Sequence, residues 1–259
     1  MISDKPIGID LSKCIGCAMC VNDCPSNYLY ISDMKAKTRE KGCIGCGHCY
    51  AICPQNAIIM NNYDTSSCTD IVDMTELDSN MFLQAMKSRR TIRQFTDEKV
   101  ESQMIEKILD AGRYCPSSTN SQNVSYTILA SKQDDIEKEC VRIFNSVKNI
   151  TSPFVKMVKD IDIDENFFFK GAQTVIVVSS KSNINASLAS SYMELMAESM
   201  GLGVLYSGFF VACAKISPRI KKMLKLPKGE KVITCMVVGY PDVKYIRTVP
   251  RKEVQVKWL

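Results

Sequence analysis

Two runs of sequence decide how the first part of this chain folds: Cys14-Ile-Gly-Cys-Ala-Met-Cys-Val-Asn-Asp-Cys-Pro25 and Cys43-Ile-Gly-Cys-Gly-His-Cys-Tyr-Ala-Ile-Cys-Pro54. Both have the spacing C-x2-C-x2-C-x3-C-P, in which three closely spaced thiolates bind one [4Fe-4S] cubane and the fourth binds the other cluster. A structural zinc site closes at four ligands and does not need a third cysteine two residues further on. The spacing therefore predicts two [4Fe-4S] clusters rather than zinc or disulfides.

The crossing rule assigns four ligands to each cluster. The first set is Cys14, Cys17, Cys20 and Cys53, and the second set is Cys43, Cys46, Cys49 and Cys24. Gly16 and Gly45 let the backbone curl close to the inorganic sulfide, and a proline with a fixed φ follows each remote ligand. We therefore expect two similar halves, 29 positions apart, each followed by a short strand near residues 28–31 and 57–60.

This part of the chain resembles a bacterial two-[4Fe-4S] ferredoxin over about residues 5–60. Its charged residues nearly cancel, with six Lys and Arg against five Asp and Glu in the first 60 positions. A freely diffusing carrier is steered to its partner by charge, and a module tethered to its partner has less need of it. We expect a ferredoxin-type domain at 1–62, a polar linker at 63–78 and a second domain at 79–259.

Composition narrows the remaining possibilities. The net charge of +5 is spread along the chain with no nucleic-acid motif, so we expect no nucleic-acid partner. Five of the thirteen cysteines are outside the two runs, without motif spacing, and are typical of small buried side chains. The first 13 residues are polar, and no apolar run is long enough to span a membrane. We therefore expect a cytoplasmic protein, in an organism that lives with little oxygen.

The second part alternates helical and strand patterns. Helices are expected near 79–88, 98–111, 134–147, 184–200 and 217–224, where apolar residues recur at helical spacing. Strands are expected at 125–130, 174–179 and 232–238, the last two being apolar on both faces. Residues 253–258 alternate polar and apolar side chains, which predicts an edge strand that pairs with another subunit.

Polar residues gather at three places in this second part. Arg89, Arg90 and Arg93 lie around a predicted helix end, where a guanidinium can bind a phosphate with a planar fork of donors. The segment 116–122 offers hydroxyls and amides without net charge, which suits a ring with carbonyls and ring nitrogens. Arg251 and Lys252 add two cations near the C-terminus.

In combination these pieces resemble the nitroreductase family of FMN proteins. The four matching pieces occur in the family's order over residues 78–259: Ser-Arg-Arg-Thr-Ile-Arg-Gln-Phe at 88–95, Pro-Ser-Ser-Thr-Asn-Ser-Gln at 116–122, Gly-Leu-Gly-Val-Leu-Tyr-Ser-Gly-Phe at 201–209, and Pro-Arg-Lys at 250–252. The resemblance implies an α+β fold, a mixed sheet wrapped by helices in an intertwined homodimer. It follows the small ferredoxin-type domain.

The resemblance also implies roles for particular residues. Arg89, with Arg90 beside it, and Thr91, Arg251 and Lys252 would hold the FMN phosphate and ribityl chain. Arg93 would face the N1/O2 edge of the ring, where a cation stabilises negative charge. Pro116, Ser117, Ser118, Asn120 and Gln122 would line the ring, in part from the neighbouring subunit, and Tyr206, Ser207 and Gly208 would contact it near N5. No residue is assigned a catalytic role, because the chemistry takes place on FMN.

We therefore expect an FMN-dependent oxidoreductase that passes electrons from the clusters to FMN and on to a nitroaromatic, quinone or activated alkene. The alternative is a non-catalytic electron-transfer partner or sensor that docks to a larger complex. The donor is left open between a reduced ferredoxin, another iron-sulfur enzyme and NAD(P)H. His48, the sole histidine, lies between two cluster ligands and is expected to fill the loop, and Phe167–Phe169 is either core or a lid over FMN.

Overall fold

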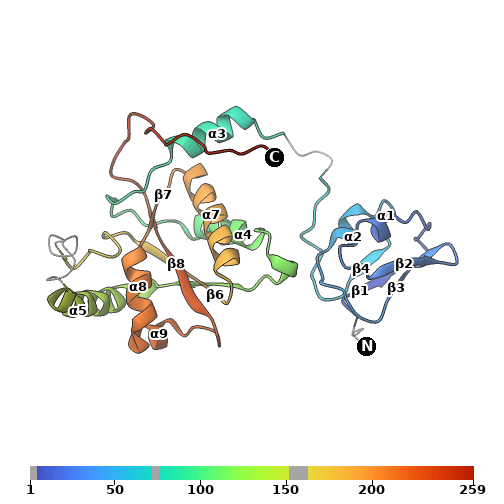
Figure 1. Ribbon diagram of the computed structural model, residues 1–259, viewed down its shortest axis with the longest axis horizontal. Coiled ribbons are helices and arrows are strands. Elements are labelled where there is room, and N and C mark those ends of the chain that lie inside the picture. Colours follow the sequence, from blue (N-terminus) through green and yellow to red (C-terminus); the bar gives the residue numbers. More distant parts are fainter. Residues whose placement is uncertain (1–4, 72–75, 152–162) are drawn as a thin grey trace. The chain divides into compact units, whose positions relative to one another are not determined.

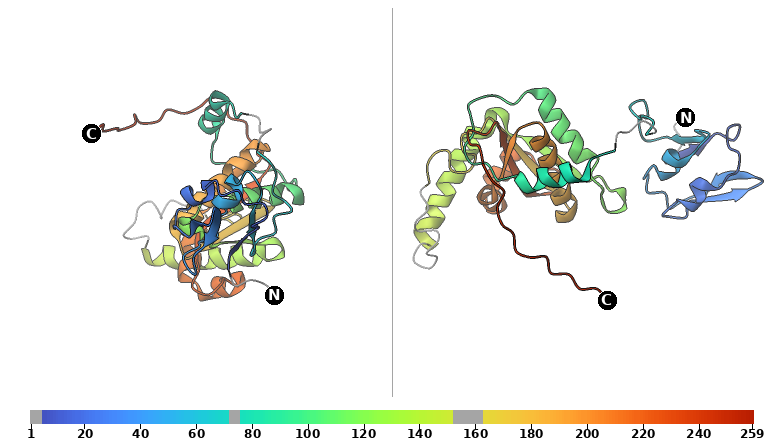
Figure 2. Two further views of the ribbon diagram at one scale, coloured as in Figure 1. Left: turned by 90° about the vertical axis from the view of Figure 1, so that its right-hand side faces the viewer. Right: turned by 90° about the horizontal axis from the view of Figure 1, so that it is seen from above.

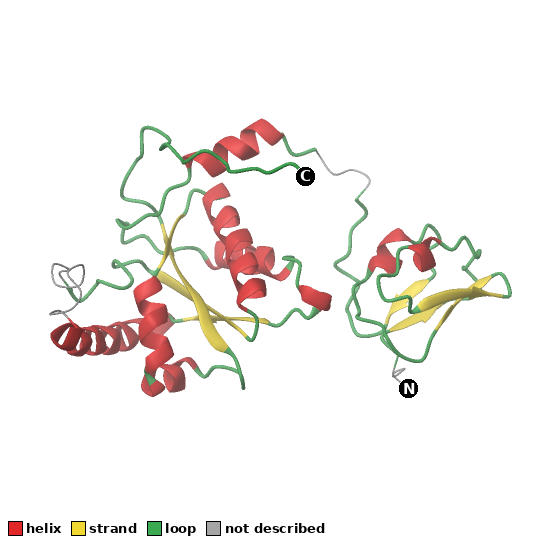
Figure 3. Ribbon diagram, viewed as in Figure 1, coloured by secondary structure: helices red, strands yellow, loops and turns green. Residues whose placement is uncertain are grey.

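A computed structural model describes residues 5–71, 76–151 and 163–259, and at 147–151 it describes the backbone alone (Figures 1 and 3). The chain divides into two compact units. Unit 1 comprises Met1–Glu76 together with Ser117–Ser121, and unit 2 comprises Leu77–Pro116 together with Gln122–Leu259. Within the expected linker at 63–78, residues 72–75 are outside the described part.

Unit 1 consists of two small antiparallel sheets and two short helices. Strand β1 (Ile7–Ile9) pairs with β4 (Ile58–Met60), and β2 (Leu29–Ser32) pairs with β3 (Lys35–Thr38). Helices α1 (Met19–Asn22) and α2 (His48–Ile52) each begin one residue before the third cysteine of a run and include it. Strands β2 and β4 confirm the short apolar strand expected after each run.

Backbone geometry explains why these loops need glycine at one position. Gly16 has φ of 72°, and a Cβ atom there would lie 2.2 Å from the carbonyl oxygen of Met34, far inside van der Waals contact. A side chain at Gly16 would therefore displace the cysteine loop from the β2–β3 turn.

Unit 2 contains a four-stranded sheet in the order β5-β6-β8-β7. The strands are β5 (Val124–Ile128), β6 (Thr174–Ser180), β7 (Gly203–Tyr206) and β8 (Lys231–Gly239), and neighbouring strands are antiparallel. Thr91 adds an isolated parallel bridge to Val204 at the β7 edge, which makes the sheet mixed. The α+β class expected from the sequence is confirmed.

Helices cover both faces of this sheet, as Figures 1 and 2 show. The inward residues of β6 alternate: Ile176 and Val178 pack with α4 (Ser102–Arg113) and α7 (Asn183–Ser199). Val175 and Val177 pack with α5 (Gln133–Thr151), α8 (Gly208–Ile216) and α9 (Pro218–Leu224). Every residue of β6 is buried, as expected for a strand with helices on both faces.

Two elements were not expected. The sequence around Gly201 predicted only a helix end, yet β7 follows it directly and α8 begins at Gly208. Alpha-helix α8 is apolar nearly all round, so its pattern has little helical periodicity. Two 3-10 turns, Ser118–Asn120 and Ala130–Lys132, also occur in the chain.

The strand expected at 253–258, which was predicted to pair with another subunit, does not form in the single chain. Residues 243–259 form no strand or helix, and Trp258 is 92% exposed. A strand needs a partner for its backbone N–H and C=O groups, and the chain supplies none here. Helix α3 (Ser79–Ser88), which the sequence predicted, is likewise unburied, with Met81 74% exposed.

Within the described residues, none of the helices has both the length and the apolar character that crossing a bilayer requires.

Candidate redox site

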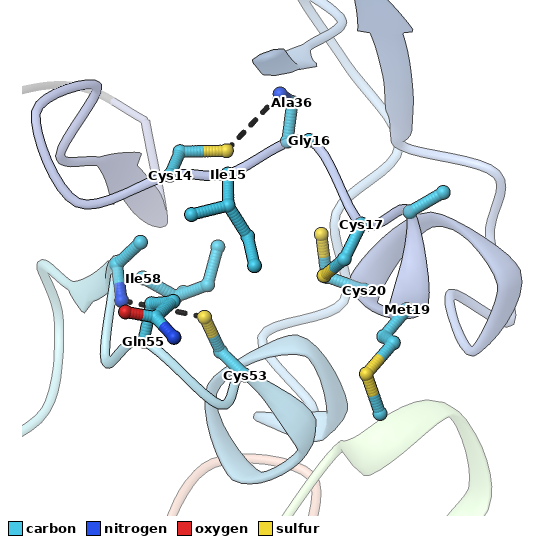
Figure 4. A pocket seen from close by; sticks show the side chains of 12 residues that line it. Cys14, Ile15, Gly16, Cys17, Met19, Cys20, Ala36, Cys53, Gln55 and Ile58 are labelled. Carbon is cyan, nitrogen blue, oxygen red and sulfur yellow. Dashed lines mark hydrogen bonds between the residues drawn. The ribbon is translucent and has the colours of Figure 1, made fainter. Parts of the chain in front are cut away.

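The first cavity in unit 1 lies between the two cysteine runs. Figure 4 shows its lining side chains, which come from the first run, from β3 and from the end of the second run. The thiols around it are Cys14, Cys17, Cys20 and Cys53. The structure thus brings together the first set of four that the crossing rule assigns.

A second cavity is lined by the other thiols, namely Cys24, Cys43, Cys46 and Cys49. Tyr28 and His48 also line it. Unit 1 therefore presents two separate four-thiol cavities, each drawing its fourth cysteine from the opposite run.

Backbone amides point at several of these sulfurs. Ala36 N donates to Cys14 Sγ at 3.4 Å and Ala57 N donates to Cys53 Sγ at 3.3 Å, both drawn in Figure 4. In the second set, Gly45 N donates to Cys43 Sγ at 3.4 Å and Tyr28 N donates to Cys24 Sγ at 3.3 Å. Such donors stabilise thiolate sulfur, which is the form that ligates iron.

The chemistry of these donor sets fits iron-sulfur clusters. A zinc ion holds its four thiolates at about 2.3 Å and leaves no cavity between them, whereas a cubane fills a space of its own. In the described part of the chain, no three His, Cys, Asp or Glu side chains converge closely enough to hold a single ion. Burial raises the pKa of Cys49 to about 11, so ligation must remove its proton.

The Tyr28 hydroxyl is buried and has no hydrogen-bond partner among the described residues.

Unit 2 contains a cavity of about 500 Å³, within the range of sites that hold a cofactor or a drug-sized ligand. Four of the predicted flavin-binding residues line it: Arg93, Tyr206, Ser207 and Gly208. The cavity lies where β7 ends and α8 begins.

The polar side of this cavity suits an anionic or electron-rich ring. Arg93 is exposed and forms no ion pair with a described carboxylate. Ser207 is the N-cap residue of α8, but its side chain accepts no hydrogen bond from the first amides of the helix. A Cβ atom at Gly208 would meet only open space. Uncapped amides at a helix N-terminus favour negative charge. A flavin ring edge therefore fits this end of the cavity.

Arg89 is partnered within the fold. Its Nη1 donates to Glu194 Oε1 of α7 at 2.7 Å, and the Glu194 side chain is 11% exposed. Thr91 is fixed by its backbone bridge to Val204, and Arg90 is half-buried beside it. These three residues do not line the cavity that Arg93 lines.

The other predicted flavin residues lie elsewhere. Ser117, Ser118 and Asn120 belong to unit 1, where Asn120 Nδ2 donates to the Gly45 carbonyl at 2.9 Å. The remaining ones are absent from the lining of the unit 2 cavity: Pro116, Gln122, Arg251 and Lys252. The last two are exposed in the C-terminal segment that forms no secondary structure.

The structure adds residues that sequence reasoning missed. Lys170 lines the cavity with its ammonium 4.7 Å from the centre of the Phe167 ring, and Phe209 lines it from α8. Phe168 and Phe169 are core residues, 1% and 0% exposed, whereas Phe167 is half-buried. Phe167 and Phe168 both line the cavity. Nothing in the spacing of the triplet distinguished its members.

Comparison with known proteins agrees with this geometry. Residues 86–240 match the model of the nitroreductase family, and residues 6–54 match the 4Fe-4S dicluster domain. An NADPH-dependent oxidoreductase of Staphylococcus haemolyticus is 25% identical over 167 residues, covering 60% of this chain and 63% of that protein. An FMN reductase [NAD(P)H] of Bacillus subtilis is 25% identical over 174 residues, covering 62% and 66%. The chain therefore spans slightly less than two thirds of each of these relatives.

Among solved structures, a nitroreductase with bound FMN from Bacteroides fragilis superposes with a TM-score of 0.57 at 20% identity, covering 69% of this chain and 99% of that chain. This similarity concerns the fold. Because the family match extends over more than half of its residues, this chain belongs to the nitroreductase family and has a 4Fe-4S dicluster domain at its N-terminus.

Proposed function

We propose that this protein is an FMN-dependent oxidoreductase that passes electrons from two [4Fe-4S] clusters to FMN and on to a small organic acceptor. The observation that carries the proposal is the presence, on one chain, of two four-thiol cavities and a nitroreductase fold whose cavity exposes Arg93. When bound, the clusters would supply single electrons and FMN would accept one or two. FMN can therefore connect a one-electron donor to a two-electron acceptor.

This chain's residues have distinct tasks in the proposal. The eight thiols of the two cavities hold the clusters. Arg93 stabilises negative charge at the ring, and the backbone N–H groups at the start of α8 donate hydrogen bonds to the polar edge of the ring. The apolar wall that includes Phe167 and Phe209 binds a flat acceptor such as a nitroaromatic, quinone or activated alkene.

The remaining flavin residues fit a homodimer. Large apolar side chains are exposed on α3 and on the C-terminal segment, including Leu83 at 48% and Val254 at 84%. Exposed apolar surface of this kind marks an interface with another protein. We propose that a second copy covers it and that Arg251 and Lys252 complete the FMN phosphate site there. Removal of residues 253–259 should then lower both the mass measured by light scattering and FMN retention.

The electron route is tested by anaerobic stopped-flow mixing with dithionite-reduced ferredoxin. Cys46→Ser removes a thiol of the second cavity, and Cys68→Ser, an exposed cysteine outside both cavities, is the matched control. We expect flavin bleaching to slow at least tenfold in Cys46→Ser, with FMN content unchanged, and to be normal in Cys68→Ser. Equal bleaching rates in the two variants would refute the relay.

The same variants distinguish the donor and the alternative role. If NAD(P)H reduces FMN equally fast in Cys46→Ser and in the parent, electrons reach FMN without the clusters. Anaerobic turnover with nitro compounds, quinones and enones tests the acceptor. A protein that is fully loaded yet reduces none of them would be an electron carrier rather than an enzyme.

A further inference from the structure

The two halves of unit 1 allow an internal comparison around the remote ligands. The segments are Cys24-Pro-Ser-Asn-Tyr28 and Cys53-Pro-Gln-Asn-Ala57. Their backbones agree: the fourth residue has φ of 52° in one and 47° in the other, and the fifth donates its N–H to the cysteine sulfur at 3.3 Å in both.

Backbone amides donate to sulfurs of both thiol sets. Besides these two bonds, Ala36 N donates to Cys14 Sγ and Gly45 N donates to Cys43 Sγ, each at 3.4 Å. The Cys24 sulfur also receives the backbone N–H groups of Ser26 and Leu29. Side chains and the surrounding charge add further differences between the two thiol sets.

The two segments differ in one side chain that contacts a cysteine ligand directly, namely Ser26. Ser26 Oγ lies 3.6 Å from Cys24 Sγ, and Ser26 is half-buried. The equivalent residue of the first set, Gln55, is exposed and lines the first cavity, and among the described residues no hydrogen bond joins its side chain to a thiol. A ligating cysteine is a thiolate without a proton, so in the assembled site the Ser26 hydroxyl must be the donor.

We propose that Ser26 tunes the second cluster by donating a hydrogen bond to the Cys24 sulfur, which raises the reduction potential of that cluster alone. The inference rests on the proposed function, because it assumes that the thiol sets hold clusters. Each cluster gains one electron from the reductant, and no bond forms or breaks. The added negative charge on sulfur strengthens an O–H···S bond, so the reduced state is favoured.

Tyr28 supports the same direction. It lines the second cavity, is 2% exposed, and its hydroxyl has no partner among the described residues. Its counterpart in the first set is Ala57, which has no hydroxyl. A buried hydroxyl without an acceptor is unfavourable, and cluster sulfide would supply one.

The first cluster has a different group of its own. Lys35 Nζ donates to the Cys14 carbonyl oxygen and so holds a cation beside the first set. A cation also favours a reduced cluster, but salt weakens its effect, whereas salt has little effect on a short hydrogen bond. Lys35 therefore acts on the first cluster and Ser26 acts on the second.

The test is an anaerobic potentiometric titration of the full-length protein, loaded with iron, sulfide and flavin, followed by electron paramagnetic resonance of the clusters. Ser26→Ala should lower the midpoint of one cluster step and leave the other in place, and Ser26→Thr should restore it. The ratio of reduced to oxidised second cluster should change by up to tenfold at fixed potential, which is about 59 mV for one electron.

Gln55→Ser provides the matched gain of function. It should raise the midpoint of the step that Ser26→Ala leaves unchanged, and Lys35→Gln should lower that same step in a manner sensitive to salt. The proposal is overturned if Ser26→Ala moves neither step or both, or if Gln55→Ser moves the same step as Ser26→Ala.

These outcomes are distinct from failure of the proposed function. Protein that binds no iron and sulfide contradicts the cluster assignment itself. Clusters that titrate as expected but deliver no electrons to FMN refute the relay and leave the role of Ser26 standing. Should Ser26→Ala fail to assemble clusters, Gln55→Ser and Ser26→Thr still decide the question.

Discussion

Replacing Glu198 with glutamine should stabilise the protein above neutral pH. The Oε1 atom of Glu198 on α7 is buried and has no hydrogen-bond partner among the described residues. Burial raises the pKa of this carboxyl to about 7, with the negative charge of Glu194 adding to the effect and Arg89 opposing it. Arg89 is already paired with Glu194 at 2.7 Å, so it neutralises only one of the two acids.

Proton linkage determines how the stability contributed by Glu198 changes with pH. Between the ordinary pKa of 4.5 and about 7, the folded protein holds a proton that the unfolded chain has lost. Stability from this group is therefore complete below pH 4.5 and is lost as the pH rises through 7. The difference corresponds to about 3 kcal/mol at 1.36 kcal/mol per pKa unit. Because the side chain is only partly buried, solvent screening reduces it to about 1–2 kcal/mol.

The assay is thermal unfolding of the full chain at pH 5 and pH 8. Glu198→Gln should raise the melting temperature at pH 8 by about 3–6 °C, since 1 kcal/mol corresponds to about 2–4 °C in a domain of this size. At pH 5 the gain should be much smaller. Glu106→Gln on α4, where the glutamate is exposed, is the control and should show no such pH dependence. An equal shift at both pH values would refute the reasoning, since a neutral packing effect would produce that result.

Three further predictions concern Gly16, Arg89 and Arg93. Gly16→Ala should lose about half of the bound iron while retaining flavin, as measured by iron and flavin assays, because its Cβ would clash with the Met34 carbonyl. Arg89→Met should destabilise the protein by about 2–3 kcal/mol by leaving Glu194 buried and unpaired, and adding Glu194→Gln should recover part of this in urea unfolding. Arg93→Ala should weaken FMN binding at least tenfold in equilibrium titration, whereas unchanged affinity would exclude this arginine from the flavin site.

Several features of the fold could be predicted because they depend on local pattern. Helix α9 begins with Ser217 accepting from Ile220 N and with Pro218 at its first position, which are signals within four residues. The buried strands β6 and β8 were evident from continuous apolar runs. The short strand β7 and helix α8 were not, because four residues of strand and an apolar helix show little periodicity. The edge strand expected at 253–258 does not form in the single chain, because a strand depends on a partner and this one was expected to pair with another subunit.

For the sites, the sequence alone determined two sets of thiols and their crossed membership, since ligand spacing along the chain limits which corners of a cubane one run can reach. It also identified Arg93, Tyr206, Ser207 and Gly208 as members of one site. Only the tertiary structure decided that Arg89 pairs with Glu194, that Lys170 and Phe167 share the cavity of Arg93, and that Ser26 reaches Cys24 Sγ. The physical reason is that ion pairs, cavity walls and side-chain hydrogen bonds depend on distances between segments, which only folding fixes.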